Sequence, residues 1–194
     1  MESMTGQETQ RELHARFEAV VRVVAQPLHR FLLRRADADT VDDILSETLL
    51  VLWRRIEDVP WPHTGQGIDP DDVLPWCYGV ARGCLANARR AQRRRLRLRE
   101  KLSSRAQQSQ QSPVAGPADH TDLHAALGVL GELDREVVLL WAWEDLAPRQ
   151  IAEVTGLTAN AVSIRLHRAK KRLSARLTRK TAQSPGHETG EGRS

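Results

Sequence analysis

The sequence has little cysteine, few aromatic residues and no long apolar run. Its 194 residues include two cysteines, and aromatic residues make up 4% of the chain. Cys77 and Cys84 are seven residues apart in a helical pattern, which predicts buried thiols on one helix face rather than a disulfide or metal-ligand framework. No segment approaches the ~18 apolar residues of a membrane span, and the N-terminal 20 residues lack the uninterrupted apolar core of a signal peptide. We therefore expect a cytoplasmic protein without membrane insertion.

Strand patterns and catalytic signatures are also missing. No segment alternates apolar and polar residues with a period of two, so the predicted fold class is all-α. There is no Ser/His/Asp set, phosphate-binding loop or metal-ligand spacing, so we expect neither an enzyme nor a cofactor. The net charge is +4. A pI of about 9.6 indicates an acidic partner such as nucleic acid.

One stretch has the composition of a linker. Residues 103–120, "SSRAQQSQQSPVAGPADH", are poor in large apolar side chains. They divide the chain into a domain at 1–102 and a second domain at 121–180, and residues 181–194 are predicted to form a disordered tail. An extended linker would reach roughly 55 to 60 Å. We therefore expect two small, free-standing helical domains.

The first domain is predicted to contain three helices. Helical spacing of apolar residues begins at Phe17, and Pro27 is expected to break or restart that helix. Thr40 is predicted to cap the second helix, and a proline-rich loop at 59–72 separates it from a third helix, which runs from about Val73 into an arginine-rich stretch. The core-facing stripe of the second helix is predicted to be Val41, Ile44, Leu45, Thr48, Leu49, Leu52 and Ile56.

The second domain ends in a pattern typical of a helix-turn-helix. Ala152 lies where two helices pack closely, Gly156 suits the left-handed turn between them, and Val162 follows six residues later. Pro148 suits the first turn of the leading helix, and Thr158 can cap the following one. The buried stripe of that second helix is predicted to be Val162, Leu166, Ala169 and Leu173.

The second helix of this motif is predicted to contact DNA. It has no acidic residue between Ala159 and Lys180, so it carries a strong positive field. A solvated basic helix is the alternative, but the charge coincides with the turn spacing, which favours DNA binding. Early side chains would meet base edges and later cations would hold phosphates, although His167 could equally be a phosphate contact or a surface residue. The predicted DNA contacts are Asn160, Ser163, Ile164, Arg165, His167, Arg168 and Lys171.

Three stretches, in this order, resemble the extracytoplasmic-function (ECF) group of bacterial RNA polymerase sigma factors. They are "VDDILSETLLVLWRR" (residues 41–55), "WCYGVARGCLANARRAQRRR" (76–95) and "ELDREVVLLWAWEDLAPRQIAEVTGLTANAVSIRLHRAKKRL" (132–173). The resemblance implies sigma domain two in the first half and sigma domain four in the second. The second half would then read the minus-thirty-five promoter element.

The resemblance also implies a polymerase-binding face. The first stretch looks like the helix that docks on the clamp of the largest polymerase subunit, with a solvated acidic helix face as the alternative. Its polymerase-binding residues would be Asp43, Ser46, Glu47, Leu50 and Arg54.

In the same family the third helix and the preceding loop approach the minus-ten element. Melting DNA requires a cationic track and a surface for an unstacked base. Trp61 and His63 could supply that surface, with core packing of Trp61 as the alternative, and Trp76 and Tyr78 are expected in the core. The minus-ten contacts implied on the third helix are Arg82, Asn87, Arg89, Arg90, Arg93 and Arg94.

The leading hypothesis is an alternative sigma factor that binds core RNA polymerase through the clamp helices and the beta flap. It would direct the enzyme to specific promoters and promote DNA opening. Many members of the family are held inactive by an anti-sigma factor, so such a partner is a further expectation. The alternative hypothesis is a helix-turn-helix transcriptional regulator that is not a polymerase subunit.

Overall fold

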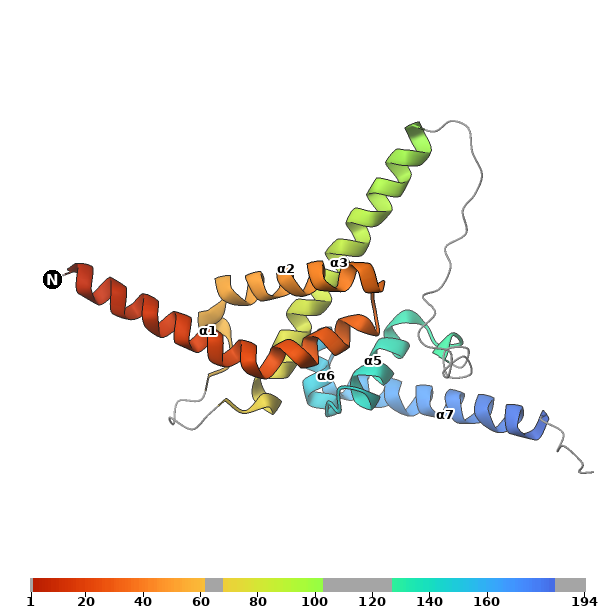
Figure 1. Ribbon diagram of the computed structural model, residues 1–194. Helices are drawn as coiled ribbons and strands as arrows, with labels where there is room; N and C mark the ends of the chain where they lie inside the picture. The colour runs from red at the N-terminus through yellow and green to blue at the C-terminus, as the bar shows by residue number, and fades with distance from the viewer. Residues whose placement is uncertain (1, 62–67, 103–126, 184–194) are drawn as a thin grey trace, which may run out of the picture.

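The computed structural model describes residues 2–61, 68–102 and 127–183, and every regular element in these ranges is helical (Figure 1). The predicted all-α fold class is therefore confirmed. The predicted linker and residues 184–194 lie outside the described residues. The helices are α1 (Glu2–Leu33), α2 (Val41–Arg54), α3 (Pro70–Leu102), α5 (Glu132–Ala142), α6 (Pro148–Thr155) and α7 (Ala159–Gln183), with short 3-10 turns η1 (Ala38–Thr40) and η2 (Ile56–Asp58).

Helices α1, α2 and α3 pack together to form the first core. The predicted stripe of α2 is confirmed, because Val41, Ile44, Thr48, Leu52 and Ile56 are buried, while Leu45 and Leu49 pack at its edge. The two cysteines lie in this core as free thiols, and burial raises the pKa of Cys77 to about 12. The prediction of buried thiols is therefore confirmed.

The expectation that Pro27 breaks the first helix is wrong. α1 runs without interruption from Glu2 to Leu33 with Pro27 inside it. A proline in a helix interior costs roughly 3 kcal/mol, because one backbone hydrogen bond is lost and the ring crowds the preceding turn. Val24 and Leu28, on either side, are fully buried. Burial of several such side chains outweighs the local cost, at about 1.5 to 3 kcal/mol each.

The start of α2 also differs from the prediction. Thr40 occupies the N-cap position but makes no side-chain cap to the helix. Its hydroxyl instead donates to the carbonyl of Asp37, at 2.8 Å, and so stabilises η1. Asp42 and Asp43 lie in the first turn of α2, where negative charge complements the helix dipole.

Helices α5, α6 and α7 form the predicted helix-turn-helix domain. Gly156 adopts a φ of 74° between α6 and α7, a conformation that glycine reaches without a Cβ clash. The hydroxyl of Thr158 accepts a hydrogen bond from the backbone N–H of Ala161, at 3.2 Å, so the predicted cap of α7 is confirmed. Val162, Leu166 and Ala169 are buried as expected, and Leu173 packs at the edge of the core.

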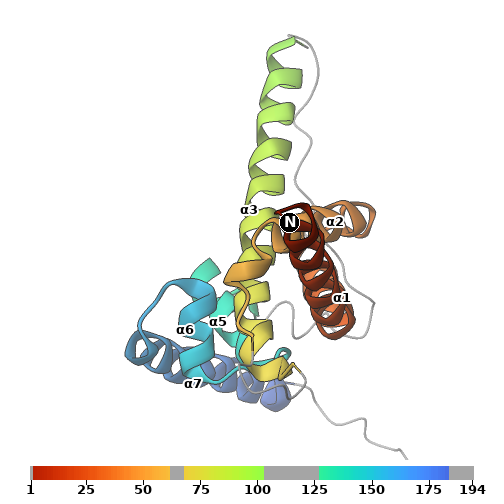
Figure 2. The same ribbon diagram turned by 90° about the vertical axis from the view of Figure 1, so that its left-hand side faces the viewer.

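The two halves of the molecule are in contact, so the expectation of free-standing domains is wrong. α6 lies against the first part of α3, as both views show (Figures 1 and 2). A Cβ on Gly79 would lie 3.9 Å from the Cα of Val154, and Gln150 Nε2 donates to the carbonyl of Asp71 at 2.9 Å. Buried residues of both halves belong to one continuous cluster. The second part of α3 projects away from this body (Figure 2).

Within the described ranges, no helix combines the length and the apolar character needed to cross a membrane.

The first turn of α6 generates a stability prediction. Ala147 occupies the N-cap with φ −66° and ψ 155°, and its backbone N–H donates to Gln150 Oε1 at 2.9 Å, but its methyl group cannot accept a bond. Ala147→Ser adds that acceptor, which is worth ~1 kcal/mol. We expect the melting temperature of the full chain to rise by about 2 to 4 °C in calorimetry.

The matched control is Ala86→Ser, at an exposed interior position of α3. No cap is available there and serine is the weaker helix former, so this variant should melt at the same or a lower temperature. Equal responses of the two variants would contradict the assigned start of α6.

Candidate nucleic-acid interface

The first half of α7 presents a mixed surface to solvent. Its buried stripe faces α5 and α6, and the opposite side carries polar, cationic and one apolar side chain. Ile164 is 43% exposed among these polar neighbours. The exposed residues of the predicted set are Asn160, Ser163, Ile164, His167, Arg168 and Lys171. The structure therefore brings these six predicted DNA contacts together on one accessible face.

The seventh predicted contact, Arg165, is held differently. Its Nη1 lies 2.6 Å from Oδ1 of Asp134 on α5. A second cation of α7, Arg172, has its Nη1 3.8 Å from the other carboxylate oxygen of Asp134. A third, Lys170, places its ammonium 3.3 Å from the ring centroid of Trp141, also on α5. Three cations of α7 are thus engaged by α5, a feature that sequence reasoning missed.

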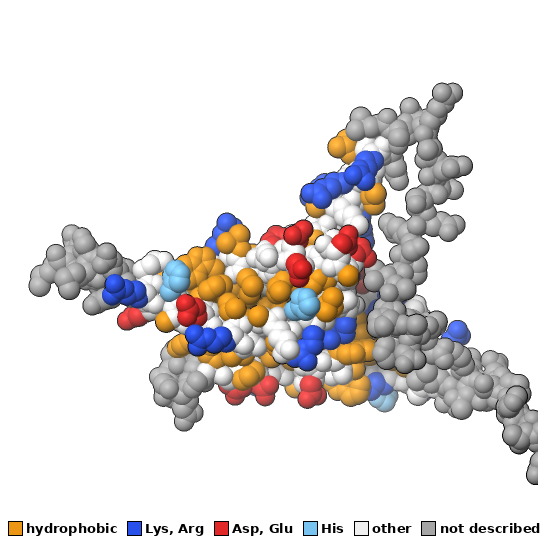
Figure 3. Space-filling view, viewed as in Figure 1, with side chains coloured by type: hydrophobic (Ala, Val, Ile, Leu, Met, Phe, Trp, Pro, Cys, Tyr) orange, Lys and Arg blue, Asp and Glu red, His pale blue; other side chains and the backbone are white. Residues whose placement is uncertain are grey.

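The predicted minus-ten residues follow α3 from its middle into the projecting part. Arg82 is half-buried, whereas Asn87, Arg90, Arg93 and Arg94 are exposed. Arg90 Nη2 donates to Asn87 Oδ1. Cationic side chains mark the projecting part of α3 in the space-filling view (Figure 3).

Arg89 departs from this row. Its Nη2 donates to the backbone carbonyl of Arg35, at 2.6 Å. One nitrogen of this guanidinium therefore satisfies a backbone group at the end of α1, although the residue is exposed.

The proposed stacking surface near the loop is only partly visible. Trp61 packs at the edge of the core, and the guanidinium of Arg16 lies over its ring at 4.9 Å. Arg16 Nη2 also donates to the carbonyl of Val59, at 2.7 Å. These contacts favour the core-packing alternative for Trp61, and His63 lies outside the described residues. Tyr78 is buried as expected.

A groove of about 550 Å³ lies between α2, α3 and α6. Trp76 is half-buried along it and packs at the edge of the core, and the guanidinium of Arg55 lies 5.1 Å from its ring centroid. Asn87 of the predicted minus-ten set and Glu153 of α6 also line it. The groove therefore places a predicted DNA-reading residue of the first half beside the helix-turn-helix.

The predicted polymerase-binding residues share one exposed side of α2, opposite its buried stripe. Leu50 is 47% exposed at the centre of this side. Apolar side chains form a band over α1 and α2, and acidic side chains lie beside it (Figure 3). The structure brings together all five residues of the set: Asp43, Ser46, Glu47, Leu50 and Arg54.

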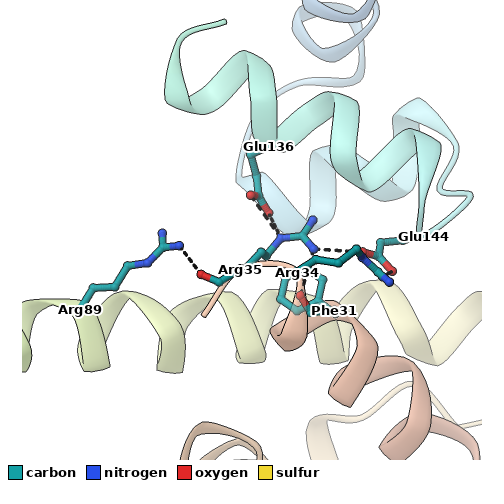
Figure 4. Close-up of polar contacts among 6 residues, drawn as sticks. All are labelled: Phe31, Arg34, Arg35, Arg89, Glu136 and Glu144. Carbon is teal, nitrogen blue, oxygen red and sulfur yellow. Dashed lines mark hydrogen bonds and ion pairs between the residues drawn. The ribbon is translucent and has the colours of Figure 1, made fainter. Parts of the chain in front are cut away.

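Where the end of α1 meets α5, four side chains form a buried ion cluster, which we call the Arg35 cluster: Arg34, Arg35, Glu136 and Glu144 (Figure 4). Arg35 Nη1 lies 3.0 Å from Glu144 Oε1, and Arg35 Nε lies 3.3 Å from Glu136 Oε1. Arg34 pairs with the second oxygen of Glu144. The side chains of Arg35 and Glu144 are each only 3% exposed.

The Arg35 cluster is electrically balanced but is not fully bonded. Two guanidinium groups face two carboxylates, and the Arg35 guanidinium also stacks on the ring of Phe31 at 3.8 Å. Nη1 of Arg35 donates to the Phe31 carbonyl at 3.1 Å, whereas its buried Nη2 bonds to no protein group among the described residues. A buried ion pair with an unsatisfied donor gives orientation more than stability.

With Gly156 between α6 and α7, the second half is a helix-turn-helix domain, a fold of the DNA-binding class. Residues 120–173 match the family described as "Sigma-70, region 4". The match confirms the resemblance to sigma factors inferred from sequence.

One curated relative supports the same family. RNA polymerase sigma factor SigV of Bacillus subtilis (strain 168) is 42% identical over 67 residues. The aligned part covers 33% of this chain and 40% of the relative, so the chain matches about two fifths of that protein's length.

Solved structures with an overall likeness include CnrH in complex with the cytosolic domain of CnrY, at 22% identity over 88% of this chain and 90% of that chain, with a TM-score of 0.49. Another is the sigma factor RpoE of Bartonella quintana in complex with the anti-sigma factor NepR, at 18% identity over 90% and 96%, also with a TM-score of 0.49. Both scores are low, so the arrangement of the two halves stands on the contacts of this chain alone.

The Arg35 cluster generates a prediction about the contact between the halves. Glu144→Gln keeps the side-chain shape but leaves Arg34 and Arg35 with one carboxylate, and removing one partner of a buried pair costs about 3 to 5 kcal/mol. Separation of the halves lets water reach the guanidinium groups without unfolding either core. We expect a larger radius of gyration in small-angle X-ray scattering and an unchanged helical circular dichroism signal.

Glu153→Gln is the control, because Glu153 is exposed on α6 and makes no ion pair among the described residues. It should leave the radius of gyration at the wild-type value. A Glu144→Gln protein as compact as wild type would show that the cluster does not hold the halves together.

Proposed function

We propose that the protein is an alternative RNA polymerase sigma factor of the ECF group. It binds core RNA polymerase, directs it to specific promoters and promotes DNA opening. The observation that carries the proposal is the sigma-70 region 4 match at residues 120–173, on a segment that folds as a capped helix-turn-helix with a cationic second helix. Charge alone would fit many nucleic-acid binders, but this family match singles out sigma factors.

In this proposal α7 enters the major groove of the minus-thirty-five element. Ser163, Ile164 and His167 face base edges, while Arg168 and Lys171 hold phosphates. Asn160, at the start of the same exposed face, completes the base-reading set. Bidentate or apolar contacts of such side chains each discriminate by about 1 to 3 kcal/mol against a wrong base. The same half would contact the beta flap of the polymerase.

The first half supplies the polymerase contact and the minus-ten contact. The exposed side of α2 docks on the clamp of the largest subunit, with Leu50 as its apolar centre and Asp43 and Glu47 beside it. Arg90, Arg93 and Arg94 on α3 form a cationic track for the backbone of the opened strand. Arg89 joins this track only after it releases the carbonyl of Arg35.

The contact between the halves constrains how both elements are read. Their centres are about 25 base pairs apart, or roughly 85 Å in straight duplex. Both distances start at the contact between Gly79 and Val154. The distance along α3 from Gly79 to Arg94 is about 22 Å. The distance from Val154 through the turn and along α7 to Lys171 is about 35 Å, even if the turn is fully extended. The two surfaces therefore lie within roughly 60 Å of each other, so the halves must separate before both elements are engaged.

The protein itself carries no reaction in this proposal, because the polymerase supplies the chemistry. It acts in the cytoplasm, where the polymerase is. An anti-sigma factor is a further proposed partner, which rests on the family resemblance.

The alternative is a helix-turn-helix regulator that acts without joining the polymerase. It uses α7 in the same way but assigns no role to the exposed side of α2 or to the cationic part of α3. A mixing experiment separates the two. Purified chain added to core polymerase should form a complex and initiate at promoters selected from a random library. The absence of a complex at low salt would remove the sigma factor proposal, and DNA binding by the chain alone would then favour the regulator.

The α7 assignment predicts two classes of variant in that initiation complex. Arg168→Gln and Lys171→Gln should each weaken DNA binding and reduce the salt slope by about 0.9, because each removes one phosphate contact. Ser163→Ala and His167→Ala should instead change which minus-thirty-five sequences are selected. Uniform weakening across all promoters by the second pair would show that base readers and phosphate contacts are misassigned.

A further inference from the structure

One acidic side chain lies among the cations of the DNA-reading helix. α7 has no acidic residue of its own between Ala159 and Lys180, so the carboxylate comes from α5. Asp134 lies in the first turn of α5, and its side chain is 18% exposed. It places one oxygen 2.6 Å from Arg165 Nη1 and the other 3.8 Å from Arg172 Nη1.

The two cations differ in how tightly they are held. The short Arg165 contact is a charge-assisted hydrogen bond, which restrains the guanidinium although its side chain is still 39% exposed. The longer Arg172 contact is a Coulomb interaction at a side chain that is largely exposed, and salt screens such a pair. Asp134 therefore engages Arg165 directly and offsets part of the positive charge of Arg172.

We propose that Asp134 is a specificity-determining positioning residue of the DNA-reading surface. Affinity for any duplex grows with the number of phosphates that the protein neutralises, whereas sequence is read at base edges. By holding Arg165 and screening Arg172, Asp134 lowers the sequence-independent part of the affinity. Discrimination then depends more on Ser163, Ile164 and His167. The inference rests on the proposed role of α7 as a DNA reader.

Arg165 has a corresponding role in this proposal. It lies on the reading helix between the base-facing Ile164 and the phosphate-facing Arg168, where a free guanidinium would reach the backbone of any sequence. Bound to Asp134, it ties α7 to α5 and sets the position of the helix. It is therefore a positioning residue, unlike the exposed cations Arg168 and Lys171.

A purely structural bridge would behave differently from a specificity device. A bridge between α5 and α7 changes thermal stability when it is removed, but it leaves the number of phosphate contacts unchanged. The slope of the logarithm of the binding constant against the logarithm of the salt concentration counts those contacts. This slope therefore separates the two roles.

The test compares the full chain with its Asp134→Asn variant on a random-sequence duplex of about 30 base pairs. Fluorescence anisotropy is measured in roughly 20 to 200 mM KCl. The variant should bind several-fold more tightly at low salt, and its slope should be steeper by about 1 to 2, because one or both arginines become available. An unchanged slope, or an absence of binding by the variant, would overturn the proposal.

Two further variants sharpen the result. Glu132→Gln removes the same charge from an exposed position in the same turn, so a general charge effect would steepen its slope equally and would also overturn the proposal. The double variant Asp134→Asn, Arg165→Gln should have a salt slope that is shallower by about 0.9 than the slope of Asp134→Asn alone. If the double variant keeps all of it, the freed cation is not Arg165.

The proposed function is tested separately with core polymerase. In holoenzyme, Asp134→Asn should initiate at a wider range of minus-thirty-five sequences than wild type does, and an unchanged range would count against the inference. If wild type fails to bind core polymerase, the sigma factor proposal falls. The duplex comparison still decides the role of Asp134.

Discussion

The contact of Arg35 with Glu144 determines how the rest of the molecule is arranged. It joins the end of α1 to the residues that follow α5, and with Arg34 and Glu136 it sets two positive charges against two negative charges in a largely buried cluster. Charges taken from water need close partners, since desolvation costs several kcal/mol per ion. The cluster therefore favours one docked position of the two halves, whereas an apolar contact of similar size would tolerate sliding.

The same cluster links the two predicted DNA-reading surfaces. The backbone carbonyl of Arg35 receives Arg89 from α3, and Glu144 precedes the loop into α6. Arg89, one of the predicted minus-ten residues, is therefore bound to the same stretch at the end of α1 that contacts the second half.

Patterns among residues close together in the sequence were sufficient to predict the buried helix stripes and the helix-turn-helix. The buried stripe of α7, the left-handed Gly156 and the Thr158 cap all depend on residues a few positions apart, so periodicity and turn chemistry predict them. Pro27 and the Arg35 cluster were not predictable in this way. The helix at Pro27 is decided by tertiary packing, and the cluster joins residues more than 100 positions apart. The Asp134 contacts were missed for the same reason, since α5 and α7 meet only in the fold.

The projecting end of α3 has a thermodynamic consequence. The side chains of residues 92–99 are all exposed, and five of them are arginines that repel one another along the helix. An isolated helical segment of this length is marginal in water, because tertiary packing normally stabilises helices. A polyanion that neutralises these arginines would remove the repulsion. Helix formation at this end is therefore coupled to the binding of any polyanion that neutralises these arginines, and each equilibrium shifts the other in the same direction.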